Sequence, residues 1–211
     1  MKYYYNPPWI IKKAFQGFNW NTKNNKVLLT FDDGPIPETT GSILKLLEHY
    51  NVKSVFFCVG NNIQKNPGLA KEILSCGHEI GNHTFNHRTI LGLNKKEMIG
   101  EIVSCNNTAL ELLDYKIRHF RPPHGRFSLK LNKVLKKEGL SNVMWSLLTF
   151  DYKNNLNIVK FALKNYIRPD SIIVLHDSLK SRDIISDSIK ATIDEVLKNE
   201  YEFGVPSECL K

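Results

Sequence analysis

The fold of this chain is decided at positions 27–35 by the stretch Val27-Leu28-Leu29-Thr30-Phe31-Asp32-Asp33-Gly34-Pro35. Its first five residues form a short apolar run that ends in turn residues, which predicts a buried strand. Gly34-Pro35 then forces a turn. The two adjacent carboxylates repel each other and lose hydration, unless a cation lies between them or one of them keeps a proton. A pair of turn-forming or helix-capping aspartates is the alternative interpretation.

The length and composition are those of an ordinary globular protein with one sizeable core. The chain has 211 residues, of which 42% are apolar and 24% are charged. We expect a single domain over residues 1–211, with residues 1–25 as an N-terminal extension. The formal charge of 29 − 21 = +8 would suit an acidic partner, such as an anionic cell-wall glycan. The lysines are scattered rather than gathered in a run interleaved with aromatic residues, which argues against nucleic-acid binding.

The cysteines and the N-terminal segment indicate in which cellular compartment the protein is expected. The cysteines form no C-x-x-C pair, and we expect reduced thiols at Cys58, Cys76, Cys105 and Cys209. Residues 1–20 lack the continuous apolar region and the small-residue cleavage site of a signal peptide. No stretch of the sequence is long enough to span a bilayer. The sequence therefore predicts a cytoplasmic protein, and it shows no sign of an obligate protein partner.

Strand and helix signals alternate after the N-terminal segment. Apolar runs predict seven strands, at 26–31, 53–59, 78–82, 118–121, 141–146, 171–176 and 201–205. Apolar residues at helical spacing predict six helices between them, within 39–50, 67–76, 94–112, 128–138, 157–167 and 183–199. The second opens at Pro67 and has Gly77 as its C′ residue, and the third opens with an Asn94–Glu97 capping box. This alternation implies a parallel sheet, which is either open and doubly wound or closed into a barrel.

Polar residues at the strand ends favour the barrel. Chemically active side chains end or follow five of the predicted strands: Asp32 and Asp33, His83 and His87, Arg121, Asp151, and His176. An open sheet would spread these groups along a line, whereas a barrel gathers the carboxyl ends of its strands around one mouth. We therefore expect an α/β fold, a deformed and incomplete TIM-like (β/α)7 barrel with its active site at that mouth.

The segment His83-Thr84-Phe85-Asn86-His87 has the spacing H-x-x-x-H. This spacing places both imidazoles on one side of a helical turn, where they can bind one metal ion. With Asp33 they form a set of two histidines and one carboxylate, which suits catalytic zinc and also the iron of non-haem oxygenases. Asp32 favours hydrolysis, because hydrolysis needs a base beside the attacking water. Two unconnected core or surface histidines are the alternative.

Three further residues are candidates for acid–base chemistry or its support. His176 ends the apolar run 172–175, and a histidine there is either a hydrogen-bonded core residue or an acid or base at the barrel mouth. Asp151 could orient His176 and raise its pKa, which would keep the imidazole protonated. Arg121 opens a proline-stiffened loop and could fix Asp32, or it could be a surface arginine beside a rigid turn.

Together these residues resemble the polysaccharide deacetylase family, the NodB-homology domains of carbohydrate esterase family 4. The resemblance runs from about Lys26 to about residue 180 and includes the segments Asn51-Val52-Lys53-Ser54-Val55-Phe56-Phe57 and Gly77-His78-Glu79-Ile80-Gly81-Asn82-His83-Thr84. It implies a deformed barrel and a divalent metal, usually Zn²⁺ and alternatively Co²⁺ or Ni²⁺. It also implies removal of acetyl groups from N-acetylated sugars or, less often, from O-acetyl esters.

The resemblance also implies a role for each candidate residue. It makes Asp33, His83 and His87 the metal ligands. It makes Asp32 the catalytic base that Arg121 holds, and His176 the acid that Asp151 tunes. The residues implied to bind substrate or oxyanion are Pro123, His124 through its backbone N–H, Tyr152 and Val174.

Four positions depart from the common pattern of the family. His124 stands where a tyrosine is usual, Leu148 where an acid is usual, Tyr152 in place of a tryptophan, and Val174 in place of a leucine. These departures bear on the shape of the acetyl pocket. We expect a metal-dependent deacetylase of an acetylated glycan or oligosaccharide. The alternatives are a glycan-binding module with lost or weak turnover, and a metal-dependent amidase or esterase that acts on a small non-glycan substrate.

Overall fold

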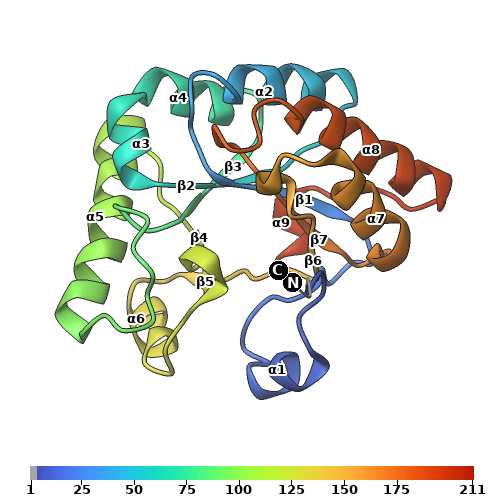
Figure 1. The fold of residues 1–211 in the computed structure, drawn as a ribbon. Coiled ribbons are helices and arrows are strands. Elements are labelled where there is room, and N and C mark those ends of the chain that lie inside the picture. The colour runs from blue at the N-terminus through green and yellow to red at the C-terminus, as the bar shows by residue number, and fades with distance from the viewer. Residues whose placement is uncertain (1–3) are drawn as a thin grey trace.

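Residues 4–211 are described by a computed structural model, in which seven parallel strands form one curled sheet (Figure 1). The order of the strands across the sheet is β5-β4-β3-β2-β1-β7-β6, and every neighbouring pair is parallel. This architecture confirms the incomplete (β/α)7 barrel. The strands are β1 (Leu28–Asp33), β2 (Val55–Cys58), β3 (Glu79–Asn82), β4 (His119–Phe120), β5 (Ser141–Asn142), β6 (Leu147–Leu148) and β7 (Ile172–His176).

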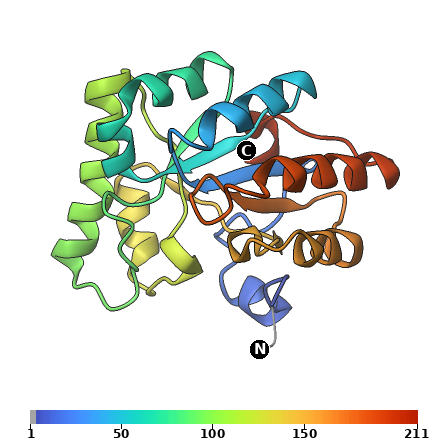
Figure 2. The ribbon, with the colours of Figure 1, turned by 45° about the horizontal axis from the view of Figure 1, so that its top comes forward.

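Helices surround the outer face of the sheet (Figures 1 and 2). Helix α7 contacts α8, α8 contacts α2, α2 contacts α4, and α4 contacts α5, so the outer layer is continuous around the curl. The helices are α1 (Trp9–Ala14), α2 (Thr40–His49), α3 (Gly60–Lys65), α4 (Pro67–Ser75), α5 (Lys95–Leu113), α6 (Leu131–Lys137), α7 (Leu156–Tyr166), α8 (Ile185–Lys198) and α9 (Pro206–Cys209), with 3-10 turns η1 (Pro123–Gly125) and η2 (Asp151–Lys153).

The two-residue period of β1 sends its side chains alternately to the two faces of the sheet. Leu29 and Phe31 pack in the large apolar cluster that the outer helices share, whereas Leu28 packs in a second cluster with Cys209 of α9. Asp32 alternates with Phe31 and therefore faces the interior of the barrel. In the register of the sheet, Asp32 lies opposite His176 of β7. The sheet thus brings the ends of two neighbouring strands to one place on its inner face.

The sheet stays open between β5 and β6, although these strands follow each other in the chain. Residues 143–146 cross from one edge of the sheet to the other. The N-terminal segment runs along this open side, since Asn19 pairs with Val143 and Asn21 pairs with Ser171. The prediction of one strand over 141–146 was therefore wrong, because only its first two residues form a strand, β5, and the other edge strand, β6, begins beyond it at Leu147. The predicted strand at 201–205 was also wrong, because only an isolated bridge between Val27 and Phe203 forms there.

The helix signals agree with the structure where they include a cap. The Asn94–Glu97 capping box opens α5 with both reciprocal hydrogen bonds at 3.0 Å. Pro67 begins α4, and Gly77 follows it in the left-handed region with φ of +78°. Helix α6 begins at Leu131, three residues later than Ser128. The short helices α1, α3 and α9 were not predicted, because each is too short to show a helical period. In residues 4–211, no helix combines the length and the apolar character needed to cross a membrane.

Candidate metal centre and active site

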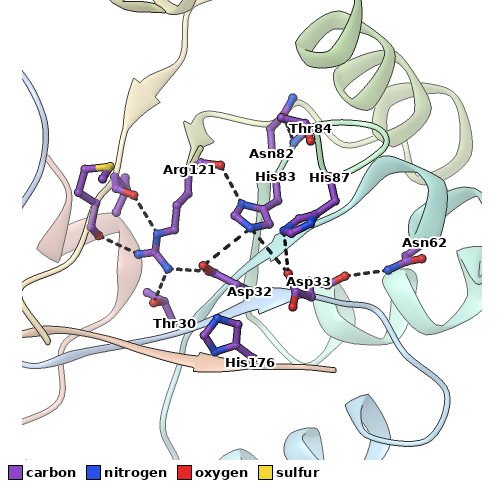
Figure 3. Close-up of polar contacts among 12 residues, drawn as sticks. Thr30, Asp32, Asp33, Asn62, Asn82, His83, Thr84, His87, Arg121 and His176 are labelled. Atoms are coloured by element: carbon purple, nitrogen blue, oxygen red, sulfur yellow. Dashed lines mark hydrogen bonds and ion pairs between the residues drawn. The ribbon is translucent and has the colours of Figure 1, made fainter. Parts of the chain in front are cut away.

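The side chains of Asp33, His83 and His87 converge at the carboxyl ends of β1 and β3 (Figure 3). The Oδ1 atom of Asp33 lies 3.2 Å from Nε2 of His87 and 3.8 Å from Nε2 of His83. All three donor atoms lie within 4.8 Å of one another. The chain thus brings one carboxylate together with two imidazoles that lie about fifty residues further along the sequence.

The protonation of this cluster suits a cation. Nδ1 of His83 lies 2.8 Å from the Arg121 carbonyl oxygen, which only accepts, so Nδ1 carries the proton and the lone pair of Nε2 points at the cluster. Burial lowers the pKa of His83 to about 4, which keeps that imidazole neutral. Burial acts to raise the pKa of Asp33, but the hydrogen bond with His87 and nearby histidine charge hold it well below its usual range. The ionised Asp33 carboxylate therefore meets the neutral imidazole of His83.

The separations within the cluster also suit a single ion. Zinc binds nitrogen and oxygen at about 2.0–2.2 Å with tetrahedral angles, which places its ligand atoms about 3.4 Å apart. The distances of 3.2 and 3.8 Å in this structure bracket that value. The Asp33 backbone is fixed as well, because Nδ2 of Asn62 donates a 2.8 Å hydrogen bond to its carbonyl oxygen. The three residues present therefore fit a divalent metal of the zinc type.

Asp32 lies beside this cluster and accepts a hydrogen bond from a buried arginine, Arg121 (Figure 3). Nη1 of Arg121 donates hydrogen bonds to Oδ1 of Asp32 at 2.7 Å and to Oγ1 of Thr30 at 2.8 Å. The remaining guanidinium nitrogens donate to the carbonyl oxygens of Val143 and Met144 at 2.9 Å. Arg121 is fully buried, which excludes a surface arginine at a rigid turn. Its fixed fork orients Asp32 so that Oδ2 faces the metal-ligand cluster, 3.9 Å from Nε2 of His83.

His176 and Asp151 form the second polar unit of the site. Oδ1 of Asp151 lies 2.7 Å from Nδ1 of His176, and Oδ2 accepts a 2.7 Å hydrogen bond from the His176 backbone N–H. Burial acts to lower the pKa of His176, but the Asp151 carboxylate outweighs it and raises the pKa to about 9. The imidazole therefore carries a proton at neutral pH, and its Nε2 points away from Asp151.

These groups open onto one cavity of about 210 Å³. The implied pocket residues His124, Tyr152 and Val174 line it, and the ring of Tyr152 meets that of His176 edge-on at 4.8 Å. Pro123 is buried and begins the η1 turn that presents His124, and it is not among the described residues that line the cavity. The full lining is Asp32, Asp33, His83, His87, His124, Gly125, Trp145, Leu148, Tyr152, Val174, His176 and Lys180.

Three residues of this lining, Gly125, Trp145 and Lys180, were not predicted to belong to the site. Trp145 lies in the crossing segment 143–146, which the sequence predicted to be part of a regular strand. Its ring packs against Gly125, whose positive φ of +64° turns the η1 loop towards the cavity. Tryptophan after an apolar run was the available signal, since aromatic rings commonly line sugar and small-molecule pockets. Lys180 follows the last strand in a loop, and no sequence pattern distinguishes it from the many other lysines.

Comparisons with known proteins show the family of this chain. The family model described as polysaccharide deacetylase matches residues 19–143. A peptidoglycan-N-acetylglucosamine deacetylase of Bacillus cereus is 32% identical over 91% of this chain and 92% of its own length. A chitooligosaccharide deacetylase of Azorhizobium caulinodans is 33% identical over 72% of this chain and 74% of its own length. The crystal structure of the Bc1960 peptidoglycan N-acetylglucosamine deacetylase superposes with a TM-score of 0.88 at 26% identity, over 96% of both chains. The chain therefore belongs to the polysaccharide deacetylase family.

Proposed function

We propose that this protein is a metal-dependent hydrolase that removes acetyl groups from N-acetylated sugars. One observation carries the proposal. One cavity is lined by the cluster of Asp33, His83 and His87 and by two further groups. These are the Asp32 carboxylate, which Arg121 holds, and the His176 imidazole, which Asp151 holds. This arrangement supplies a cation site, a base and an acid, which are the three parts that hydrolysis of an amide requires.

The three clustered residues would hold the metal, and zinc is the ion whose ligand chemistry they fit best, with cobalt or nickel as alternatives. A divalent cation bound there supplies Lewis-acid chemistry, since it polarises the acetyl carbonyl and lowers the pKa of water. Asp33 brings one negative charge to the site, and the two imidazoles are neutral ligands. The cluster would therefore leave a bound dication with net positive charge to act on the substrate.

Asp32 is the proposed general base. Arg121 occupies its Oδ1, so Oδ2, which faces the ligand cluster, is the atom that accepts the proton of the attacking water. The guanidinium then has a second use, because it balances the charge of a buried carboxylate that must stay ionised to act as a base.

His176 is the proposed general acid. Asp151 engages Nδ1, so Nε2 is the atom that donates a proton to the departing amine. The raised pKa of about 9 keeps this proton in place at neutral pH until the carbon–nitrogen bond breaks. An amine is a poor leaving group unless it is protonated, and His176 therefore determines whether acetate is released.

The remaining pocket residues would bind the acetyl group. His124 has a left-handed backbone with φ of +58°, and we propose that its N–H helps to hold the oxyanion. One such donor typically contributes about 3 kcal/mol to transition-state stabilisation. Tyr152 and Val174 would surround the methyl group, together with Leu148.

The named relatives act on peptidoglycan N-acetylglucosamine and on chitooligosaccharide. We therefore propose an N-acetylglucosamine-containing glycan or oligosaccharide as the substrate of this chain. A cytoplasmic location remains a prediction, and cell fractionation tests it.

The test is acetate release from a panel that runs from N-acetylglucosamine through chitooligosaccharides to peptidoglycan, with a small acetanilide as a non-glycan member. The zinc-loaded protein is expected to release acetate from at least one glycan and to lose this activity in a chelator. Asp32→Asn and His176→Ala should each reduce kcat by two orders of magnitude or more, by about 10²–10⁴-fold for a positioned acid or base. Wild-type activity in both variants would refute the assigned roles. Turnover of the acetanilide alone would favour a non-glycan amidase.

A further inference from the structure

The two proposed histidine ligands are held unequally by the protein. The His83 side chain is 2% exposed, and its Nδ1 is fixed by the Arg121 carbonyl. The His87 side chain is 32% exposed, and within residues 4–211 no hydrogen bond fixes its Nδ1. Its ring contacts are with two other imidazoles, those of His83 and His124, at 5.0 and 4.9 Å between centroids. The position of His87 must therefore come from its backbone.

The backbone that carries these histidines is strained. Thr84 has φ of +67° and His87 has φ of +55°, and both are non-glycine residues in the left-handed region. Such a conformation persists only where surrounding contacts enforce it. Asn82 enforces the first half of the loop, because its Oδ1 accepts the Thr84 N–H at 2.8 Å (Figure 3). Its Nδ2 donates to the carbonyl oxygen of Ile102 and to Oδ1 of Asn106, both in α5.

In the second half of the loop, Glu101 of α5 holds Asn86 and Phe85, and Asn61 of α3 also donates its N–H to the Phe85 carbonyl oxygen at 2.9 Å. Oε2 of Glu101 accepts the backbone N–H of Asn86 at 2.8 Å, and Oε1 accepts from Nδ2 of Asn86 at 3.0 Å. The carbonyl oxygen of Glu101 accepts the N–H of Phe85 at 3.0 Å. Glu101 thus bonds the two residues that directly precede His87, through both its side chain and its main chain.

Glu101 is an unusual residue to bury for stability alone. It is 6% exposed, and none of the described lysines, arginines or histidines comes within 4.0 Å of its carboxylate. A buried carboxylate without a cation loses hydration that its hydrogen bonds only partly replace. An apolar residue at this inward position of α5 would avoid that loss, so a requirement other than packing accounts for the acid.

The geometry points to Glu101 as a positioning residue of the metal site, which clamps Asn86 so that His87 meets Asp33 in the correct place. It would touch neither substrate nor metal. This inference rests on the metal site of the proposed function but not on the reaction, since it concerns how tightly the three ligands hold an ion.

The test is zinc affinity, measured by competition with a chromophoric chelator, in Glu101→Ala and Glu101→Gln. Loss of an outer partner of a metal ligand typically weakens binding by roughly 10–100-fold, and we expect this range for Glu101→Ala. In Glu101→Gln, the side-chain oxygen of the new glutamine can still accept the Asn86 N–H. The NH₂ group of the glutamine can donate to Oδ1 of Asn86 once the Asn86 amide flips, so the zinc affinity of this variant should stay within about threefold of wild type. Excess zinc should restore acetate release in Glu101→Ala, because the acid and base are intact.

Two controls separate positioning from general damage to α5. Met98→Ala removes a buried apolar side chain from the same helix and lowers the melting temperature, but it should leave zinc affinity unchanged. Asn86→Ala removes only the side-chain half of the clamp at an exposed position, so it folds and should weaken zinc binding less than Glu101→Ala does.

The cobalt-substituted proteins give a second readout, the visible absorption that reports coordination geometry. Glu101→Ala is expected to alter this spectrum and Met98→Ala to preserve it. Wild-type zinc affinity and cobalt spectrum in both Glu101→Ala and Asn86→Ala would overturn the inference, as would equal zinc loss in Met98→Ala. If the wild type binds zinc but releases no acetate from any substrate, the proposed function fails while this inference stands.

Discussion

Asp151 holds His176 at two points, with one carboxylate oxygen 2.7 Å from the ring nitrogen Nδ1 and the other 2.7 Å from the backbone nitrogen. The carboxylate therefore fixes the tautomer and the direction of the ring at once, and it raises the pKa of His176 to about 9 against the effect of burial. Three of the following predictions depend on this pair or on its counterpart, Arg121 with Asp32.

The first prediction concerns the pH dependence of kcat. His176 must be protonated to act as the acid, so kcat should fall as pH rises through about 9. Asp151→Asn removes the charge that raises the pKa, and the basic limb should move towards the ordinary histidine value of about 6.5. Profiles of kcat from pH 5 to 10 for both proteins measure this shift. Asp183→Asn, at an exposed carboxylate, is the control and should keep the wild-type profile.

The second prediction concerns stability and follows from the same pKa. The folded-state pKa of His176, about 9, exceeds the unfolded value of about 6.5. The folded protein therefore binds the proton more tightly, and this stabilisation is complete below pH 6.5 and is lost as pH rises to about 9. Urea unfolding of wild type and His176→Gln across this range should show a difference in unfolding free energy that declines with pH. A constant difference would mean that His176 does not titrate as described.

The third prediction concerns the buried arginine. Arg121→Met leaves the Asp32 carboxylate buried without its cation and leaves Thr30 and two carbonyl oxygens without their donor. Breaking a buried ion pair in this way costs about 3–5 kcal/mol. The free energy of unfolding in urea should fall by that amount, while Arg118→Met, at an exposed site, should change it by less than about 0.5 kcal/mol. A small effect of Arg121→Met would show that the charge of Asp32 is balanced in another way.

The fourth prediction concerns the acyl pocket. Val174 is fully buried and lines the cavity, and it is one methylene smaller than leucine. The wild-type pocket should therefore accept an N-propionyl group better than Val174→Leu does. One methylene in such a pocket is worth about 1–3 kcal/mol, or roughly 10–200-fold. The ratio of kcat/KM for propionylated and acetylated chitooligosaccharide measures this, and an unchanged ratio would place the acyl group elsewhere.

The candidate site residues could be found in the sequence because each of them is marked by its immediate neighbours in the chain. Asp32, His83, Arg121 and His176 each end or follow a buried strand, and parallel strands bring their carboxyl ends to one edge. Cap signals such as Asn94 with Glu97 are equally local, and the structure confirms them. The incomplete barrel followed from the need to gather these groups at one mouth.

Features that depend on long-range contacts could not be predicted in this way. Residues 143–146 read as a continuation of one strand, but they cross the open side of the barrel because Asn19 of the N-terminal segment pairs with Val143. The placement of Trp145 in the cavity follows from that crossing. No sequence pattern distinguishes Glu101 from the other charged residues of the chain, and only its contact with Asn86, fifteen residues away, shows its place beside the site.

The most direct test of the central claim is an anomalous-difference map from a crystal of the zinc-loaded protein. We expect one zinc ion about 2.0–2.2 Å from Oδ1 of Asp33 and from Nε2 of both His83 and His87. Asp32 should remain outside the coordination shell, with its Oδ1 on Arg121. A zinc ion bound elsewhere, or one that takes Asp32 as a ligand in place of Asp33, would contradict the account.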